Sequence, residues 1–257
     1  MSTHSQAIQD QFGPQAQAYL ASAVHAAGAD LQRAREIVSA AIPPKVQALD
    51  VGCGAGHLSF ALAPALSEVI AFDPSAAMLD AVKAGAAERG LQNIATQQGS
   101  AEALPFADAS FCVAATRYST HHWLQLEAAL QEMRRVVRPG GHVLVIDVEG
   151  DPEPLVDTHF QTMELLRDRS HIRNRTPAEW RALLQGADLE LLAYEQWPLR
   201  LEFASWVARL RTPEQNVAMI RRLQTEAPRE VQEGLRIEAD GSFTAHTGLY
   251  WARVPRQ

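Results

Sequence analysis

The sequence predicts an α/β fold with a doubly wound, mostly parallel sheet. Short apolar runs alternate along the chain with amphipathic helical segments, which is the order of β-α-β units. Most of these runs are continuously apolar instead of alternating with polar residues, as is typical of strands that are buried on both faces. The alternation is clearest between residues 45 and 150, so the α/β core is expected there.

The first elements are one helical segment and two β-α units. Apolar side chains recur at helical intervals within 15–41, which predicts one or two helices, and Pro43 and Pro44 end the pattern. Ser75 can cap a later helix, and Gly90 can end it. The elements after the first segment are a strand at 46–51, a helix at 57–66, a strand at 68–73 and a helix at 75–90.

The remaining elements complete a seven-stranded sheet and add helices outside it. The Pro-Gly-Gly sequence at 139–141 predicts a tight turn before a strand. The further strands are expected at 94–99, 111–116, 142–148 and 189–197 and near 247–254. The further helices are expected at 126–137 and near 155–168, 177–185, 203–210 and 213–226.

The length of 257 residues fits one domain that carries a small accessory lobe. We expect an N-terminal helical lid at 1–44, the α/β core at 45–150, and a helical substrate-cap segment at 151–257 that includes the last two strands. A hydrophobic content of 47% with 21% charged residues is typical of a soluble globular protein.

The composition also indicates location and partners. The polar amino terminus has no signal-peptide pattern, and no apolar stretch reaches the ~20 residues of a membrane span, so a cytoplasmic protein is expected. Cys53 and Cys112 lie in apolar segments, so we expect reduced thiols and no metal site. The net charge is −7 and the arginines are dispersed, which favours a small-molecule partner over nucleic acid. A monomer or a homodimer is expected.

A glycine-rich turn occurs in the sequence LDVGCGAGHLSF. A strand, a glycine turn and a helix N-terminus form a site where backbone N–H groups face a ligand and no Cβ blocks its approach. The spacing is Gly52-x-Gly54-x-Gly56, whereas dinucleotide-binding folds place their third glycine where this chain has His57. Asp73 ends the next strand, where a carboxylate can accept hydrogen bonds from two ribose hydroxyls.

Four motifs in order resemble a known family: LDVGCGAG, VIAFDPSAAML, GSAEALPF and RRVVRPGGHVLVID. Through them, residues 45–148 resemble the class I S-adenosylmethionine-dependent methyltransferases, and are most similar to the small-molecule branch of the ubiquinone and menaquinone biosynthesis methyltransferases. The resemblance implies a Rossmann-like sheet with helical lid insertions. It also implies S-adenosylmethionine as the methyl donor, S-adenosylhomocysteine as the product, and in-line transfer to an oxygen, nitrogen or carbon nucleophile of a small molecule.

The same resemblance implies a set of donor-binding residues. They are Asp50, Gly52, Cys53, Gly54 and Gly56 at the turn, Asp73, Pro74 and Met78 after the second strand, Ser100, Ala101 and Glu102 after the third, Arg117 after the fourth, and Tyr19 and His25 in the lid. The glycines and Asp50 would contact the methionyl part, Asp73 the ribose and Met78 the adenine. The family often has an acidic residue where this chain has Ser100, so weaker adenine contacts are expected. The alternative role for Tyr19 is a hydrophobic core contact of an amphipathic helix.

The segment TRYSTHHWL follows the fourth strand and should face the reactive end of the donor, because ligands bind at the carboxyl ends of parallel strands. Arg117 has two interpretations of equal weight. It binds the carboxylate of the donor, or it is a structural arginine tied to Asp147 or Glu149.

The adjacent His121 and His122 are candidate catalytic residues, because either can take a proton from a nucleophile at neutral pH. The alternative is that they start a helix, with one bonded to the backbone and one exposed. Trp123 beside them either forms a wall of the substrate pocket or belongs to the core.

Three other functions stay open at this point. A nicotinamide-dependent oxidoreductase is disfavoured by His57, and a nucleic-acid or protein methyltransferase is disfavoured by the acidic net charge. A non-catalytic regulatory protein that binds S-adenosylmethionine is the third, because the sequence identifies a donor site and leaves the acceptor site undefined.

Overall fold

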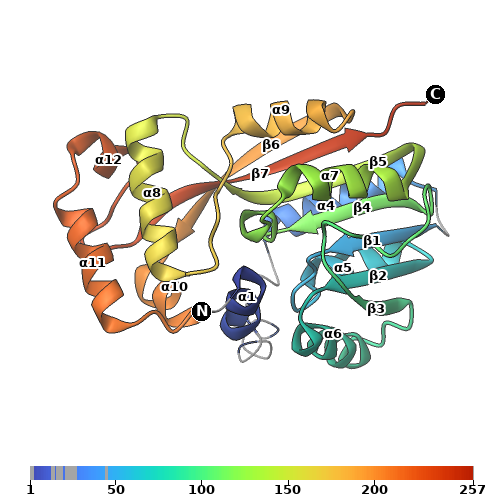
Figure 1. Cartoon of the computed structure of the whole chain (residues 1–257), viewed down its shortest axis with the longest axis horizontal. Helices are drawn as coiled ribbons and strands as arrows, with labels where there is room; N and C mark the ends of the chain where they lie inside the picture. Colours follow the sequence, from blue (N-terminus) through green and yellow to red (C-terminus); the bar gives the residue numbers. More distant parts are fainter. Residues whose placement is uncertain (1–2, 13–14, 16–19, 21–27, 44–45, 257) are drawn as a thin grey trace.

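The computed structural model describes residues 3–12, 15, 20, 28–43 and 46–256. Figure 1 shows a sheet that runs across the molecule, with helices along it and a separate group of helices at one end. The strands are β1 (Gln47–Val51), β2 (Glu68–Asp73), β3 (Ile94–Gln98), β4 (Phe111–Arg117), β5 (Val137–Glu149), β6 (Glu190–Leu201) and β7 (Phe243–Arg253). Their order in the sheet is β3-β2-β1-β4-β5-β7-β6.

The predicted doubly wound, mostly parallel sheet is confirmed. Strands β1 to β5 are parallel to one another, whereas β7 is antiparallel to both β5 and β6. The chain moves outward in one direction from β1 through β2 to β3 and in the other from β4 to β5. The carboxyl ends of β1 and β4 are therefore the switch point at which ligands bind in such sheets.

Helices cover both faces of the sheet because its strands are apolar on both faces. Leu49 packs in a cluster with α7 (Leu126–Val136) and α9 (Pro177–Gly186). The adjacent Ala48 packs in another cluster with α4 (Ala29–Ala41) and α5 (His57–Leu62) on the opposite face. Helix α6 (Ala76–Glu88) packs beside α5, where Val82 meets Phe60.

Further helices form a lobe at the far ends of β6 and β7, on the left in Figure 1. This cap lobe consists of α8 (Pro154–Arg167), α10 (Phe203–Arg209), α11 (Glu214–Thr225) and α12 (Arg229–Gly234). Pairing between β5 and β7 ends at Glu149 and His246, while β6 and β7 stay paired as far as Leu201 and Phe243. The hairpin thus extends beyond the carboxyl end of β5 and carries the cap lobe to the edge where ligands bind.

The predicted elements that fall on described residues are present, with differences at several ends. Of the helical segment predicted at 15–41, α4 is present, and residues 16–19 and 21–27 lie outside the described residues. The predicted helix at 57–66 ends at Leu62 and continues as the 3-10 turn η2 (Ala63–Ala65). The predicted turn at 139–141 lies inside β5, because the backbone N–H of Gly140 donates to the carbonyl of Val254 and keeps this segment paired with the chain after β7. Helix α12 was not predicted, and helix α1 (His4–Phe12) lies within the expected helical lid at 1–44 although no separate helix was specified there.

Two further expectations concern thiols and membrane helices. Cys53 and Cys112 are free cysteines, as predicted. Within the described ranges, no helix is both long enough and apolar enough to cross a membrane.

Candidate functional site

The glycine turn between β1 and α5 has a left-handed backbone at each of its glycines. Gly52, Gly54 and Gly56 have φ of +67°, +50° and +90°. A Cβ on Gly52 would lie 2.0 Å from Oγ of Ser119, and one on Gly56 would lie 2.9 Å from Cγ2 of Val82. A Cβ on Gly54 would meet no atom of the described residues within 4 Å. Glycine is therefore needed at all three positions for backbone conformation, and the described part of the chain leaves the space beside Gly54 open.

Asp73 joins the end of β2 to this turn. Its Oδ2 accepts a hydrogen bond of 2.9 Å from the backbone N–H of Gly54, and its Oδ1 accepts one of 2.9 Å from the N–H of Ser75. Burial raises the pKa of Asp73 to about 6, although the two N–H groups favour the ionised form. The carboxylate is thus fixed in orientation and retains lone pairs for a ligand.

Asp50 is a second buried carboxyl beside the turn. Its Oδ2 accepts a hydrogen bond of 2.6 Å from the hydroxyl of Ser59. Burial raises its pKa to about 7, and the hydrogen bond from Ser59 lowers it only in part. Burial also raises the pKa of the Cys53 thiol, which is therefore neutral. A cationic ligand here would stabilise the ionised forms of Asp50 and Asp73.

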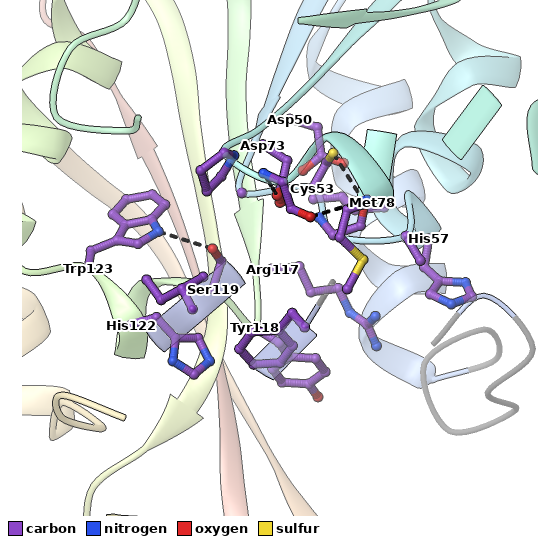
Figure 2. A pocket seen from close by; sticks show the side chains of 18 residues that line it. Asp50, Cys53, His57, Asp73, Met78, Arg117, Tyr118, Ser119, His122 and Trp123 are labelled. Atoms are coloured by element: carbon purple, nitrogen blue, oxygen red, sulfur yellow. Dashed lines mark hydrogen bonds between the residues drawn. The ribbon is translucent and has the colours of Figure 1, made fainter. Parts of the chain in front are cut away.

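A pocket opens at the carboxyl ends of β1, β2 and β4, and we call it the glycine-loop pocket. It is lined by Ile8, Phe12, Asp50, Gly52, Cys53, Gly54, Ala55, His57, Leu58, Asp73, Pro74, Ser75, Met78, Arg117, Tyr118, Ser119, His122 and Trp123. Figure 2 shows Met78 and His57 on one side of this pocket and His122 and Trp123 on the other. The indole N–H of Trp123 donates to Oγ of Ser119 over 3.0 Å.

A second pocket adjoins the first, and we call it the histidine pocket. It is lined by Phe12, Tyr118, His121, His122, Val148, Glu164, Arg167, Asp168, Asn174, Leu199, Leu201, Trp206, Arg209 and Leu210. The two pockets share Phe12, Tyr118 and His122. Tyr118 has a φ of +51°, which is uncommon for a non-glycine residue and marks a constrained backbone at this junction.

The two adjacent histidines lie in the 3-10 turn η3 (Thr120–His122) after β4. Nδ1 of His121 is 2.7 Å from Oδ1 of Asp147, and Nδ1 of His122 is 3.2 Å from the carbonyl of Ser170. Burial lowers the pKa of His121, but the charge and hydrogen bond of Asp147 outweigh it, so this pKa is raised. Burial and the charge of His121 lower the pKa of His122 to about 4. The two rings therefore have opposite tendencies to hold a proton.

Comparisons with known proteins agree with this geometry. Residues 48–141 match a family model described as a methyltransferase domain. The protein YafE of Escherichia coli is 45% identical over 194 residues, which are 76% of this chain and 94% of YafE. YcgJ of Bacillus subtilis, described as a methyltransferase, is 34% identical over 202 residues, which are 79% of each chain. The chain belongs to the class I S-adenosylmethionine-dependent methyltransferases.

Two more comparisons extend this assignment. The crystal structure of Bacillus subtilis YcgJ superimposes on this methyltransferase with a TM-score of 0.80 and 29% identity, and it covers 88% of this chain and 99% of that one. The demethylmenaquinone methyltransferase of Lactococcus lactis is 33% identical over 135 residues, which are 51% of this chain and 54% of that protein.

Most of the predicted donor-binding residues of this methyltransferase gather around one pocket. Those that line the glycine-loop pocket are Asp50, Gly52, Cys53, Gly54, Asp73, Pro74, Met78 and Arg117. Gly56 does not line it but is the N-cap of α5 and lies close to Val82 of α6. Ser100, Ala101 and Glu102 lie outside its lining, next to Gly99, whose N–H donates to the carbonyl of Asp73. Tyr19 and His25 lie outside the described residues.

Arg117 pairs with a residue that the sequence did not suggest. Its Nε donates to Oδ2 of Asp30 in α4, and its guanidinium lies 4.4 Å from the ring centroid of Tyr118. The structural interpretation named Asp147 or Glu149 as the partner, and this was wrong. Arg117 is in register with Ile146, which faces α4 and α5, so Arg117 and Asp147 are on opposite faces of the sheet.

The two histidines of the methyltransferase differ in position. His122 lines both pockets, whereas His121 lines only the histidine pocket. His122 is bonded to the backbone, as one alternative proposed, but the expected exposure of the other histidine was wrong, because the side chain of His121 is 17% exposed. Trp123 belongs to a core cluster, as one interpretation expected, and it also lines the glycine-loop pocket.

Sequence reasoning did not name Ile8, and it gave Tyr118 no role of its own although Tyr118 lies in the segment expected to face the donor. Ile8 lies in α1, which was not specified as a separate helix, and its contact with the pocket joins segments that are distant in the chain. Tyr118 could have been found from its position directly after Arg117, at the end of β4. Within the described residues, no group of three or more histidine, cysteine, aspartate or glutamate side chains could hold a metal ion.

Proposed function

We propose that this methyltransferase binds S-adenosylmethionine in the glycine-loop pocket and transfers its methyl group to a small-molecule acceptor. The observation that carries the proposal is the open space beside Gly54, bordered by the fixed carboxylate of Asp73. An extended ligand can lie against the turn there, because no Cβ occupies the space. Asp73 has free lone pairs for ribose hydroxyls.

The residues present fit the methyl donor. The donor carries an ammonium and a sulfonium, and both would favour the ionised forms of the buried Asp50 and Asp73. Met78 supplies apolar surface for a planar base. Ser100, Ala101 and Glu102 are proposed for the outer edge of the adenine, since their loop leaves the sheet beside Asp73. Arg117 would face the donor carboxylate while paired with Asp30.

Alignment and exclusion of water are the main tasks of the protein in methyl transfer. The donor supplies a methyl group on a positively charged sulfur, which leaves as a neutral thioether. Helix α1 is proposed as the lid, because Ile8 and Phe12 line the glycine-loop pocket and Phe12 also lines the histidine pocket. Nε2 of His4 is 2.9 Å from the carbonyl of His122, and Nε2 of Gln11 donates to the carbonyl of Leu210 over 2.9 Å. The same helix therefore contacts the core and the cap lobe.

A small-molecule acceptor is supported by the second pocket, which adjoins the first under α1. The name of the Lactococcus lactis relative assigns it a small molecule, demethylmenaquinone. The net charge of −7 disfavours a nucleic-acid substrate.

The proposal is tested by calorimetric titration with S-adenosylhomocysteine. We expect one site per chain in the wild-type protein and no measurable binding by Gly54→Val, whose side chain would fill the open space. Gly90→Val is the matched control, because Gly90 also has a left-handed backbone, with φ +66°, and open space within 4 Å, but lies outside the pocket. Tighter binding of NAD than of S-adenosylhomocysteine, or unchanged binding by Gly54→Val, would refute the donor site.

A further inference from the structure

The histidine pocket has the walls, the charges and the unpaired groups of a specific binding site. We propose that it is the methyl-acceptor site and takes an uncharged molecule with a phenol- or enol-type hydroxyl, whose proton passes to Nε2 of His121 while Asp147 holds the imidazole. This inference rests on the proposed function, because the methyl donor must lie in the adjoining glycine-loop pocket. The shared residues Phe12, Tyr118 and His122 mark where donor and acceptor would meet.

Asp147 fixes His121 in one orientation and one tautomer. Oδ1 of Asp147 faces Nδ1 of His121 at 2.7 Å and also accepts the N–H of Val148 at 2.8 Å. Oδ2 accepts the N–H of Thr120 at 2.8 Å and the Thr120 hydroxyl. An ionised carboxylate only accepts hydrogen bonds, so neutral His121 carries its proton on Nδ1 and has a lone pair on Nε2. Among the described residues, Nε2 has no hydrogen-bond partner.

The neighbouring histidines are poorer proton acceptors than His121. Burial lowers the pKa of His122 to about 4 and that of His171 to about 2. Nε2 of His171 is also engaged, 2.8 Å from Oε1 of Gln161. The pKa of His121 is raised instead, because Asp147 outweighs the effect of burial.

Several charged or titratable groups face His121, and each bears on its proton affinity. Asp147 approaches from β5, His122 from the same turn, and Glu164, Asp168 and His171 from α8 and the loop after it. The three carboxylates favour the protonated imidazole, and the two histidines oppose it when they are charged. The negative groups prevail at His121, so it can hold a proton taken from an acceptor.

The charges of the pocket balance, which favours an uncharged acceptor. Two carboxylates, Glu164 and Asp168, line it together with two guanidiniums, Arg167 and Arg209. Nη1 of Arg167 is 3.1 Å from Oε2 of Glu164, and Oδ1 of Asp168 accepts the Ser170 hydroxyl at 2.6 Å. Among the described residues of the lining neither sign is in excess, so an ammonium or a carboxylate ligand would lose its hydration without gaining an unpaired group of opposite charge from them.

The rest of the wall is apolar and carries two unpaired N–H donors. Val148, Leu199 and Leu201 provide surface for an aromatic or aliphatic body. Asn174 is 2% exposed and Trp206 is fully buried. Among the residues that the structure describes, Nδ2 of Asn174 and Nε1 of Trp206 have no hydrogen-bond partner. Buried donors are almost always paired in folded proteins, so these two indicate a missing oxygen. We therefore expect the acceptor to carry a second oxygen, such as a carbonyl.

The hydroxyl must be acidic enough for an imidazole base. A phenol has a pKa near 10, as in tyrosine, which is within reach of a histidine whose pKa is raised. In the transfer, a bond forms between the acceptor oxygen and the methyl carbon, and the carbon–sulfur bond breaks with its electron pair left on sulfur. The hydroxyl proton passes to Nε2 of His121, and the imidazolium later releases a proton to solvent.

The first test measures His121 itself, by nitrogen-15 NMR of the histidines in the protein saturated with S-adenosylhomocysteine. We expect neutral His121 to carry its proton on Nδ1, and Asp147→Asn to lower its pKa, because the negative partner is lost. His159→Gln is the matched control, since His159 is half-buried in α8, lies outside the lining of the histidine pocket, and among the described residues hydrogen-bonds to the carbonyl of Leu155. A proton on Nε2 in the wild-type protein, or an unchanged pKa in Asp147→Asn, would overturn the assignment.

The second test measures the chemical class of the ligand with three probes of similar size. They are 4-hydroxyacetophenone, the anion 4-acetylbenzoate and the cation 4-(aminomethyl)acetophenone, each added to the same saturated protein. We expect only the phenol to shift the Nε2 signal of His121, and Asn174→Asp to weaken its binding about tenfold with unchanged affinity for S-adenosylhomocysteine. Preference for either ion, or no shift of His121 with any probe, would overturn the acceptor class and leave the donor site standing. Failure to bind S-adenosylhomocysteine would instead refute the proposed function.

The third test identifies the methylated atom. The protein is incubated with methyl-labelled S-adenosylmethionine and a small-molecule extract of cells, and the labelled product is analysed by NMR. We expect the label on an aromatic or enolic oxygen, and at least about a 100-fold lower rate for His121→Gln but not for His159→Gln. A label on nitrogen, sulfur or carbon would overturn the inference, and absence of any labelled product would count against the proposed function.

Discussion

The carboxylate of Asp73 accepts a 2.9 Å hydrogen bond from the backbone N–H of Gly54, which joins the carboxyl ends of two neighbouring strands through one side chain. The same carboxylate accepts the N–H of Ser75, where the next helix begins. Asp73 therefore fixes the glycine turn before any ligand arrives. The contact links the stability of the turn to the proposed binding of the methyl donor.

Replacing Asp73 should weaken donor binding while the turn is kept. Asp73→Asn retains one oxygen for a backbone N–H but loses the charge, so we expect S-adenosylhomocysteine to bind more weakly by about 1 to 3 kcal/mol. Calorimetry measures the loss, and Asp80→Asn, on the exposed face of α6, serves as the control. Equal affinity in the two variants would mean that the ribose is held elsewhere.

Donor binding should depend on pH through the same residue. The pKa of Asp73 is raised to about 6 by burial, so below pH 6 much of the free protein carries a protonated Asp73. A ligand whose hydroxyls donate to the ionised carboxylate must displace that proton, so its affinity should rise between pH 5 and 8 by up to about tenfold per pH unit below the pKa. Calorimetry in two buffers of different ionisation enthalpy counts the protons released. Ligand binding to Asp73→Asn should release fewer protons than binding to the wild-type protein. The same number of protons in both proteins would show that Asp73 is not the group that titrates.

Asp50 should make the folded protein less stable as pH rises. Its folded-state pKa is about 7, above the ordinary value of about 4, because burial disfavours its charge. The folded state therefore binds more protons than the unfolded state between these values, and the stability contributed by the protonated form is lost as pH rises through 7. Asp50→Asn removes this effect, because asparagine does not titrate. The unfolding free energy of Asp50→Asn minus that of the wild-type protein should therefore increase between pH 4 and 8, on the order of a few kcal/mol. Urea unfolding at both pH values measures it, and parallel pH profiles would rule it out.

The ion pair between Arg117 and Asp30 should matter for stability, because their side chains are only 5% and 7% exposed. Asp30→Asn leaves the guanidinium without its buried counter-charge, and we expect a loss of about 3 to 5 kcal/mol. Glu36→Gln removes an exposed partner of Arg33 from the same helix and should change stability by less than about 1 kcal/mol. Denaturant unfolding compares the two, and similar small losses in both would show that the buried pair contributes little.

Much of the fold follows from local patterns that the sequence displays directly. Strand and helix periods, the capping Ser75 and the glycines of the turn act over a few residues, so the α/β order and the turn were predicted correctly. Asp73 could also be placed beside the turn, because parallel β-α-β units bring the carboxyl ends of β1 and β2 together.

The contacts made across the sheet and between lobes needed the three-dimensional structure. Asp147 follows His121 by 26 residues and lies on β5, next to the strand β4 that precedes His121. Asn174 lines the histidine pocket from the loop after α8. Arg117 turned out to face Asp30 because its direction depends on strand register, which fixes the face on which each side chain lies.

The sequence by itself therefore determined the methyltransferase core and the turn at which the donor is proposed to bind, because those features depend on backbone conformation and on neighbours in the chain. Only the tertiary structure decided which acids pair with Arg117 and His121, and that α1 and the cap lobe enclose a second pocket. Those contacts join segments far apart in sequence. They depend on how the hairpin of β6 and β7 extends past the sheet edge, which no local pattern encodes.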